Sequence, residues 1–228
     1  GKEEEITSLY DYFLLGLNHI SSGFDHLAFL LALILLNRNY KDLLIAVTGF
    51  TLGHSLTLAL GVLGMIAPMT NWVEAVIGFS IALIALEFIA KETSQVNVYL
   101  VSLSLFWAAL FFIVFLTSIN ISFIGLIGLS LFSITYLYLV TQKEIKLSLF
   151  ITTLFGLVHG FGFGGYLSQV GFQEGRLVNA LLGFNLGVEA GQLLALGLFT
   201  TVMFAFNYFK ILPKFPFRPL TGCLLVGL

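Results

Sequence analysis

The chain has 228 residues, of which 58% are hydrophobic and only 10% are charged, and its formal net charge is -2. A soluble domain carries about 25% charged residues, so the composition excludes an ordinary soluble fold, and no basic block indicates nucleic-acid binding. The single cysteine, Cys223, excludes an internal disulfide and any CxxC metal or redox motif. The composition therefore predicts an all-α, polytopic transmembrane bundle, with residues 1–228 forming a single domain in contact with membrane lipid.

Seven apolar stretches are long enough to cross a bilayer, which takes about 20 residues, and an eighth begins near the end of the sequence. Ser21-Ser22-Gly23 is expected to loosen or break the first span, and the seventh is overlong for a perpendicular crossing. We expect both ends of the sequence to be boundaries within a longer chain, with an exported domain before Gly1. The predicted spans are Tyr10–Leu36, Leu43–Gly64, Trp72–Ala90, Val96–Thr117, Ser122–Val140, Leu147–Val170 and Leu177–Phe209, and the eighth begins at Leu220–Leu228.

The basic residues of the loops predict the orientation, because lysine and arginine accumulate on the cytoplasmic side. The loops on one side hold only Lys2 and Arg176. We therefore expect the N-terminus outside, on the periplasmic side if the membrane is a bacterial inner membrane. The loops on the other side hold Arg38, Lys41, Lys91, Lys143, Lys146, Lys210, Lys214 and Arg218.

Two patterns concern helix packing. Phe50-Thr51-Leu52-Gly53-His54-Ser55 aligns with Phe155-Gly156-Leu157-Val158-His159-Gly160, which is compatible with a parallel 3+3 repeat of spans 1–3 and 5–7. Chance similarity among helices rich in glycine, leucine and phenylalanine is the alternative. Glycines spaced four apart predict faces on which helix backbones approach closely. They are Gly156, Gly160 and Gly164 in the sixth span and Gly183, Gly187 and Gly191 in the seventh.

The first span contains three polar side chains, His19, Asp25 and His26. An aspartate at the centre of a span costs about 2.5–3.5 kcal/mol on insertion scales, so its presence points to a function. Counting 1.5 Å per residue from the basic anchors places His26 and His54 about 18 Å from the cytoplasmic edge, and His159 about 20 Å. With straight helices, His19 lies two turns from His26 and nearer the outer surface. These depths predict one intramembrane metal site, and hydrogen-bonded packing histidines are the alternative.

Further polar groups extend this constellation. Asn185, Glu189 and Gln192 form one stripe at i, i+4 and i+7 on the seventh span, at a middle-to-outer depth. Imidazole and carboxylate ligands suit nickel, zinc, cobalt or ferrous iron rather than magnesium or calcium. The predicted metal ligands are His19, Asp25, His26, His54, His159 and Glu189, and Glu74 is a candidate at the entrance. Ligating histidines need hydrogen-bonding neighbours, for which Asn18, Thr51, Ser55, Asn185 and Gln192 are the candidates.

The histidine motifs of spans 1, 2 and 6, Val73-Glu74 of span 3 and the polar stripe from Asn185 to Gln192 of span 7 resemble motifs of the HupE/UreJ family of bacterial membrane proteins. The resemblance thus covers spans 1, 2, 3, 6 and 7. It implies a permease for nickel or a similar transition metal that serves hydrogenase and urease maturation. The narrower permease group carries a glutamate shortly after the His-Gly of span 6, whereas residues Phe161 to Gly165 contain none, and Glu189 is the candidate substitute. The motifs are His19-x5-Asp25-His26, Phe50-Thr51-Leu52-Gly53-His54-Ser55-Leu56-Thr57-Leu58, Val73-Glu74, Phe155-Gly156-Leu157-Val158-His159-Gly160-Phe161-Gly162-Phe163 and Asn185-Leu186-Gly187-Val188-Glu189-Ala190-Gly191-Gln192.

Three functions are compatible with this sequence. The first is transport of a divalent transition metal, in which His19 and Glu74 recruit the ion and the deeper ligands hold it midway. The second is a metal-dependent intramembrane hydrolase acting on lipid or peptide, with a metal-activated water and Ser55 orienting the substrate. Against it, the sequence lacks the HExxH motif, and Gly78-Phe79-Ser80 is followed by Ile81 rather than by the glycine of a rhomboid-like site. The third is a structural or sensory membrane subunit.

Overall fold

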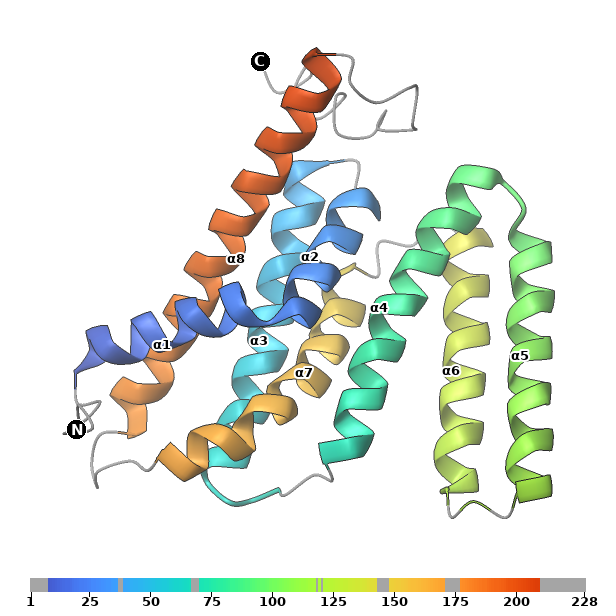
Figure 1. The fold of residues 1–228 in the computed structure, drawn as a ribbon, viewed down its shortest axis with the longest axis horizontal. Coiled ribbons are helices and arrows are strands. Elements are labelled where there is room, and N and C mark those ends of the chain that lie inside the picture. Colours follow the sequence, from blue (N-terminus) through green and yellow to red (C-terminus); the bar gives the residue numbers. More distant parts are fainter. Residues whose placement is uncertain are drawn as a thin grey trace. The chain divides into compact units, whose positions relative to one another are not determined.

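The computed structural model describes residues 8–36, 39–66, 70–117, 119, 121–142, 148–170 and 177–209, and every regular element among them is a helix. Their order along the chain can be followed by colour in Figure 1. The helices are α1 (Leu9–Ser22), α2 (Phe24–Leu36), α3 (Tyr40–Val62), α4 (Thr70–Thr93), α5 (Val96–Thr117), α6 (Phe123–Gln142), α7 (Ser148–Val170) and α8 (Leu177–Tyr208).

The helices confirm an all-α membrane bundle. Five of them, α3, α4, α5, α6 and α8, are long and apolar enough to cross a bilayer, and α1 with α2 is a sixth if the bent pair forms one span. In α7, the apolar residues Leu149–Phe163 alone are fewer than a full crossing needs, and the helix continues to Val170. The count of seven spans and the side of the N-terminus therefore stay predictions, and the start of an eighth span at Leu220–Leu228 lies outside the described residues.

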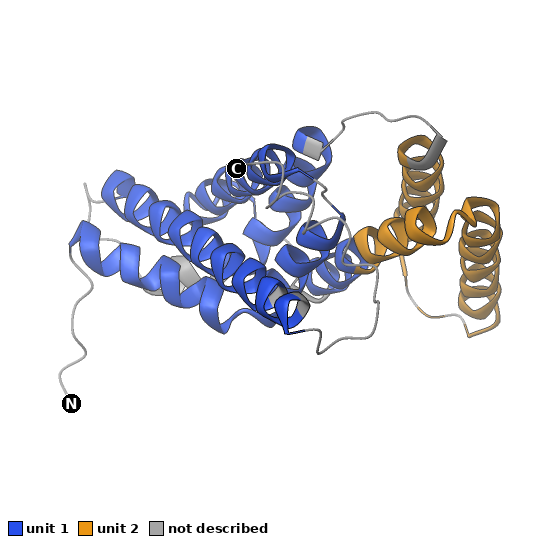
Figure 2. Ribbon diagram, turned by 90° about the horizontal axis from the view of Figure 1, so that it is seen from above, with its two compact units in different colours: residues 1–81, 148–228 blue, residues 82–147 orange. Residues whose placement is uncertain are grey.

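The chain forms two compact units, coloured separately in Figure 2. Unit 1 comprises residues 1–81 and 148–228, and unit 2 comprises residues 82–147. Unit 1 contains α1, α2, α3, α7, α8 and the first half of α4. Unit 2 contains the second half of α4 together with α5 and α6. The predicted repeat of spans 1–3 and 5–7 stays a prediction.

Unit 1 is built from two tightly packed helix pairs, α3 with α7 and α1 with α8. On α7, a Cβ added to Gly156 would lie 3.0 Å from the backbone nitrogen of His54, and one added to Gly160 would lie 3.0 Å from the carbonyl carbon of His54. Side chains at these glycines would therefore collide with the α3 backbone, which confirms the close approach predicted from their spacing. On α8, Gly183 and Gly187 lie against α1 in the same way, and Gly16 of α1 lies against the α8 backbone. In both pairs the residue numbers of the contacts rise together, so the paired helices are parallel.

The first predicted span is broken at Gly23, as its sequence indicates. The hydroxyls of Ser21 and Ser22 donate hydrogen bonds to the Asn18 carbonyl oxygen at 3.1 and 2.7 Å, and such side-chain bonds compete with the helix. Gly23 has an extended backbone (φ -82°, ψ 96°), and its N–H closes α1 by donating to the His19 carbonyl. The chain then turns by 71° into α2. This turn brings residues on either side of Gly23 closer together than a straight helix would.

Unit 2 is held mainly by apolar side chains, including the buried Leu103, Val114, Leu126 and Leu137. A polar contact joins α5 to α6, where the indole N–H of Trp107 donates to the Ser133 hydroxyl at 2.8 Å. The glycines of α6 make no interhelical backbone contact of the kind seen in unit 1: a Cβ on Gly128 would meet nothing within 4 Å.

Candidate metal centre

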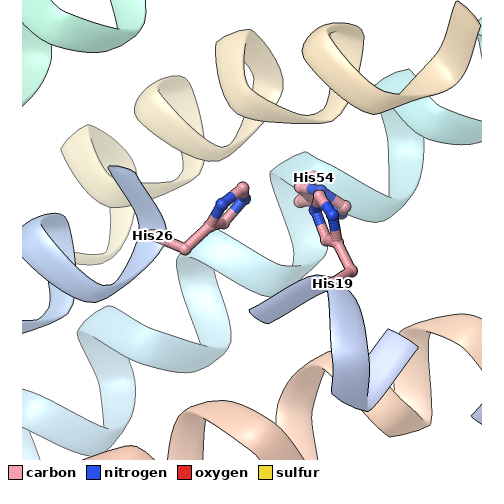
Figure 3. Close-up of side chains that lie close together, drawn as sticks. All are labelled: His19, His26 and His54. Carbon is pink, nitrogen blue, oxygen red and sulfur yellow. The ribbon is translucent and has the colours of Figure 1, made fainter. Parts of the chain in front are cut away.

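Three histidines meet inside unit 1, each carried by a different helix. His19 lies one turn before the break in α1, His26 lies one turn after it in α2, and His54 lies in the middle of α3 (Figure 3). One ring nitrogen from each lies within 4.8 Å of the others. The ring centroids of His19 and His26 are 4.6 Å apart, and those of His54 lie 5.8 and 5.9 Å from them. The 71° break thus does what a straight span could not, because it turns His19 and His26 toward one another.

His159 of α7 adjoins this group without belonging to it. Its ring centroid lies 5.4 Å from that of His26, but its nitrogens are outside the set that satisfies the common 4.8 Å limit. The predicted meeting of His26, His54 and His159 therefore has His26 at its centre, with His19 replacing His159 as the third member of the tightest group.

The imidazoles have buried nitrogens without hydrogen-bond partners. Among the described residues, His54 Nδ1 and Nε2 and the Nε2 atoms of His19, His26 and His159 lack any partner. The His54 side chain is fully buried. Buried polar atoms are normally hydrogen-bonded, so several orphaned nitrogens gathered in one place need an explanation. A transition-metal ion supplies one, since the imidazole lone pair is a common metal ligand.

Two of the rings have their tautomers set by a neighbour. His26 Nδ1 lies 3.0 Å from Asp25 Oδ1, and His159 Nδ1 lies 2.8 Å from the carbonyl oxygen of Phe155. A carboxylate or carbonyl oxygen can only accept, so in each case the ring donates from Nδ1–H. In the neutral rings this leaves the lone pair on Nε2, the same atom that has no partner. Hydrogen bonding of one nitrogen to a carboxylate or carbonyl is how metal-ligating histidines are commonly held.

Phenylalanine rings surround the cluster and keep it apolar. The Phe163 ring is tilted by 40° against the His19 ring with the centroids 4.0 Å apart. Phe50 and Phe29 lie 4.9 and 5.1 Å from His159, and Phe184 lies 5.5 Å from His19. The candidate site residues drawn from the sequence included no phenylalanine, so this role was missed. The repeated Phe-x3-His spacing at Phe50–His54 and Phe155–His159 was the available signal. In such surroundings electrostatic attraction between a cation and its ligands is stronger than in water.

A family model described as HupE / UreJ protein matches residues 2–107 and 94–226. The chain belongs to the HupE/UreJ family. No curated protein and no solved structure matches it. Membership confirms the resemblance drawn from the sequence motifs, and it agrees with the helical membrane architecture.

In this HupE/UreJ chain, the two predicted acidic ligands lie differently with respect to the histidines. Asp25 contacts the cluster through its hydrogen bond to His26, and its side chain is 37% exposed. Glu189 on α8 is half-buried, and no nitrogen–carboxylate contact joins it to the three-histidine group. The structure thus joins Asp25 to the cluster as the hydrogen-bond partner of a histidine, whereas a metal-ligand role for Glu189 stays a prediction.

Most of the remaining candidates lie on two helices: Thr51 and Ser55 on α3, and Asn185 and Gln192 on α8. The Thr51 hydroxyl donates to Gln192 Oε1 at 2.7 Å, and the Ser55 hydroxyl donates to the Thr51 carbonyl at 2.6 Å. Asn185 donates from Nδ2 to the Leu181 carbonyl at 2.8 Å and has a buried Oδ1 without a partner among the described residues. None of these hydrogen bonds is made to a histidine ring.

Two predicted residues lie at exposed positions. The side chains of Asn18 and Glu74 are both exposed, and Asn18 contributes its backbone carbonyl to the two serines at the break. Asn18 therefore contributes to the turn through its backbone, and a role for its side chain beside a histidine stays a prediction. The two-turn separation predicted between His19 and His26 is wrong, because the helix is not straight at Gly23.

Proposed function

We propose that this chain binds a divalent transition-metal ion, of the nickel, cobalt or zinc type, at His19, His26 and His54 and carries it across the membrane. The observation that supports this function is the gathering of three imidazole nitrogens within 4.8 Å of one another, in rings that each have a buried nitrogen without a hydrogen-bond partner among the described residues. The metal is the transported substrate. The expected location is a bacterial inner membrane with the N-terminus on the periplasmic side.

The donor set suits such an ion. A zinc ion binds imidazole nitrogen at about 2.0–2.1 Å, so ligands in tetrahedral positions lie about 3.3 Å apart. Nitrogens within 4.8 Å reach that spacing by small rotations of the side chains. Asp25, hydrogen-bonded to His26, brings a negative charge next to the ligands, and His159 is the nearest further imidazole. Glu189 and Glu74 remain the proposed carboxylates along the path of the ion.

The way the site is assembled favours passage over permanent storage. His19 belongs to the α1–α8 pair, whereas His54 belongs to the α3–α7 pair, and His26 follows the turn at Gly23. The glycine contacts lock helices within each pair, so a small displacement of one pair against the other would separate the ligands. The absence of cysteine from the described cluster also removes the ligand that holds soft ions most firmly.

The test is equilibrium metal binding by the purified full chain. After dialysis against nickel, cobalt or zinc, elemental analysis should find about one ion bound per chain. Losing a residue that only orients a metal ligand weakens metal affinity by up to about 100-fold. His54→Ala removes a proposed ligand itself, so it should weaken binding by at least that factor. Ser104→Ala, at an exposed position of α5, should bind as the unaltered chain does. Equal binding by the His54→Ala variant would contradict the proposed site.

Transport needs its own measurement. Proteoliposomes containing the chain and a metal-sensitive dye should take up the ion faster than empty liposomes and faster than the His54→Ala variant. Metal binding without uptake would refute transport. If a cleaved lipid or peptide then appeared on incubation with native membranes, the hydrolase alternative would replace it.

A further inference from the structure

Unit 2 contains a buried carboxylate that the metal centre does not use. Glu87, on the second half of α4, is only 3% exposed, and it is the only buried acidic residue in the described part of the chain. The face of α4 around it is apolar, with Leu83, Ile84 and Ala90 all buried. An ionisable group kept in such a place within a membrane protein is a candidate functional group.

Each carboxylate oxygen of Glu87 has one partner. Oε1 accepts a hydrogen bond from Lys91 Nζ at 2.6 Å, one helical turn along α4. Oε2 accepts a hydrogen bond from the Tyr136 hydroxyl of α6. These two are the titratable groups in contact with the carboxyl. From α5, the indole N–H of Trp107 donates to Ser133 of α6 rather than to Glu87.

The two partners differ in how firmly they are held. Tyr136 is buried at 6% exposure within the packed face of α6, so its hydroxyl stays beside the carboxyl. The Lys91 side chain is 41% exposed, and its long flexible stem allows the ammonium group to turn outward to water. When the ammonium leaves, a buried carboxylate remains with a single neutral partner, which is a strongly unfavourable state.

We propose that Glu87 is a proton-binding site controlled by Lys91. In one state the carboxylate is ionised and paired with the Lys91 ammonium. In the other state the ammonium points to water, and one proton from the adjoining aqueous phase forms an O–H bond at Glu87. Tyr136 remains hydrogen-bonded to the carboxyl in both states. The charge of the three-residue group rises from zero to +1, because the lysine keeps its proton.

Such a site gives the membrane part of the chain a place to load and unload a proton in a different unit from the histidines. If the proposed function holds, proton exchange here offers a source of energy for metal movement. The proton site itself requires only the contacts within unit 2, so it stands or falls separately from transport.

Infrared difference spectroscopy of the purified full chain tests the site directly. Lowering the pH should produce the C=O stretching band of a buried protonated carboxyl, and labelling the glutamate carboxyls with carbon-13 should shift this band. Glu87→Gln should remove the band, and Tyr136→Phe should move it to higher frequency because one hydrogen bond is lost. Lys91→Met should change how the band depends on pH, because the ammonium group no longer competes with the proton.

Glu92→Gln, at a half-exposed position of the same helix, is the matched control and should keep the band. If the labelled protein shows no such band, or if Glu87→Gln leaves it unchanged, Glu87 is only a brace between α4 and α6 and the proposal is wrong. In proteoliposomes, Glu87→Gln should keep metal binding and lose the response of nickel uptake to a proton gradient. A band that depends on Glu87 in a chain that moves no metal would refute transport and leave the proton site intact.

Discussion

The two units solve the problem of helix packing in different ways. In unit 1 the helices touch through their backbones, because Gly156 and Gly160 admit the α3 backbone at His54 and Gly187 admits the α1 backbone at Leu17. In unit 2 the helices touch through side chains, and Gly128 has open space around it. Backbone contact fixes the axial position of one helix relative to its partner more firmly than flexible side chains do. The unit that must hold histidines from three helices together is the one packed in this way.

The units also differ in how they treat buried polar groups. In unit 2 the indole of Trp107 has a hydroxyl partner, and both carboxylate oxygens of Glu87 are hydrogen-bonded. In unit 1, by contrast, the nitrogens of His26 and His54 include buried atoms without partners among the described residues. An apolar environment penalises every such orphan, and unit 2 shows that this chain can give its buried polar groups hydrogen-bond partners. The difference favours a ligand as the missing partner in unit 1.

The largest effect should come from filling a backbone contact in unit 1. In Gly156→Leu the new Cβ would lie 3.0 Å from the backbone nitrogen of His54 and closer still to the Phe50 carbonyl. These are backbone atoms that cannot rotate away, so α3 and α7 must separate. We expect destabilisation at or above the upper end of the roughly 1–3 kcal/mol typical of overpacking, together with loss of metal binding. Thermal unfolding followed by size-exclusion chromatography measures the first, and elemental analysis the second.

The matched change in unit 2 is Gly128→Leu. It places the same side chain at an exposed position of α6 with nothing within 4 Å of its Cβ. Leucine is a better helix former than glycine by under about 1 kcal/mol, so stability should stay equal or rise slightly. Equal losses of stability in the two variants would abolish the distinction between backbone and side-chain packing.

Much of the fold of unit 1 follows from local sequence signals. Ser21-Ser22-Gly23 predicted the break because serine hydroxyls and a glycine both weaken a helix, and the structure turns by 71° there. Glycines four residues apart on α7 and α8 predicted close helix contacts, and these were found. The histidines of α2 and α3 were predicted to meet because residue counting placed both about 18 Å from the cytoplasmic edge of the membrane.

The sequence could not predict distances between side chains that depend on how a helix bends or on which way a side chain points. Residue counting assumes straight helices, so it placed His19 two turns from His26 instead of at a ring distance of 4.6 Å. It could not tell which phenylalanines face the histidines, because nothing in the sequence around Phe163 and Phe184 distinguishes them from phenylalanines that face lipid. It also could not separate a ligand from the partner of a ligand, and Asp25 is hydrogen-bonded to His26. These features arise from packing between segments far apart in sequence.

An intermediate effect should follow from Gly23→Ala, which tests the turn without disturbing the helix pairs. Alanine tolerates the backbone angles of Gly23 (φ -82°, ψ 96°). Its Cβ, however, would lie 2.8 Å from His26 Nδ1, 2.9 Å from the His19 carbonyl oxygen and 3.1 Å from Asp25 Oδ1, so the hydrogen bond between His26 and Asp25 and the end of α1 must both shift. We expect metal affinity to fall by about 10–100-fold, the usual result of disturbing a ligand's hydrogen-bond partner, with a smaller loss of thermal stability than in Gly156→Leu. Isothermal titration with nickel or zinc measures the affinity.

The control for this variant is Gly78→Ala on α4, where an added Cβ meets nothing within 4 Å. Its metal affinity should equal that of the unaltered chain. If Gly23→Ala also bound metal normally, the hydrogen bond between His26 and Asp25 would have no part in metal binding, and the proposed role of Asp25 in supporting His26 would be refuted.

The smallest effect should come from Ser133→Ala in unit 2. The change removes the hydroxyl that accepts the Trp107 N–H at 2.8 Å and leaves that buried donor without this partner. The loss of one such interaction between membrane helices costs about 1 kcal/mol, so the unfolding temperature should drop by a few degrees at most. Ser104→Ala, which alters an exposed serine bonded only to its own helix at the Leu100 carbonyl, should leave the unfolding temperature unchanged.

Metal affinity should stay the same in both variants, because the histidines lie in the other unit. A loss of affinity in Ser133→Ala without a matching loss in Ser104→Ala would mean that the packing of unit 2 controls the metal centre, and the two regions would then have to be treated as one functional body.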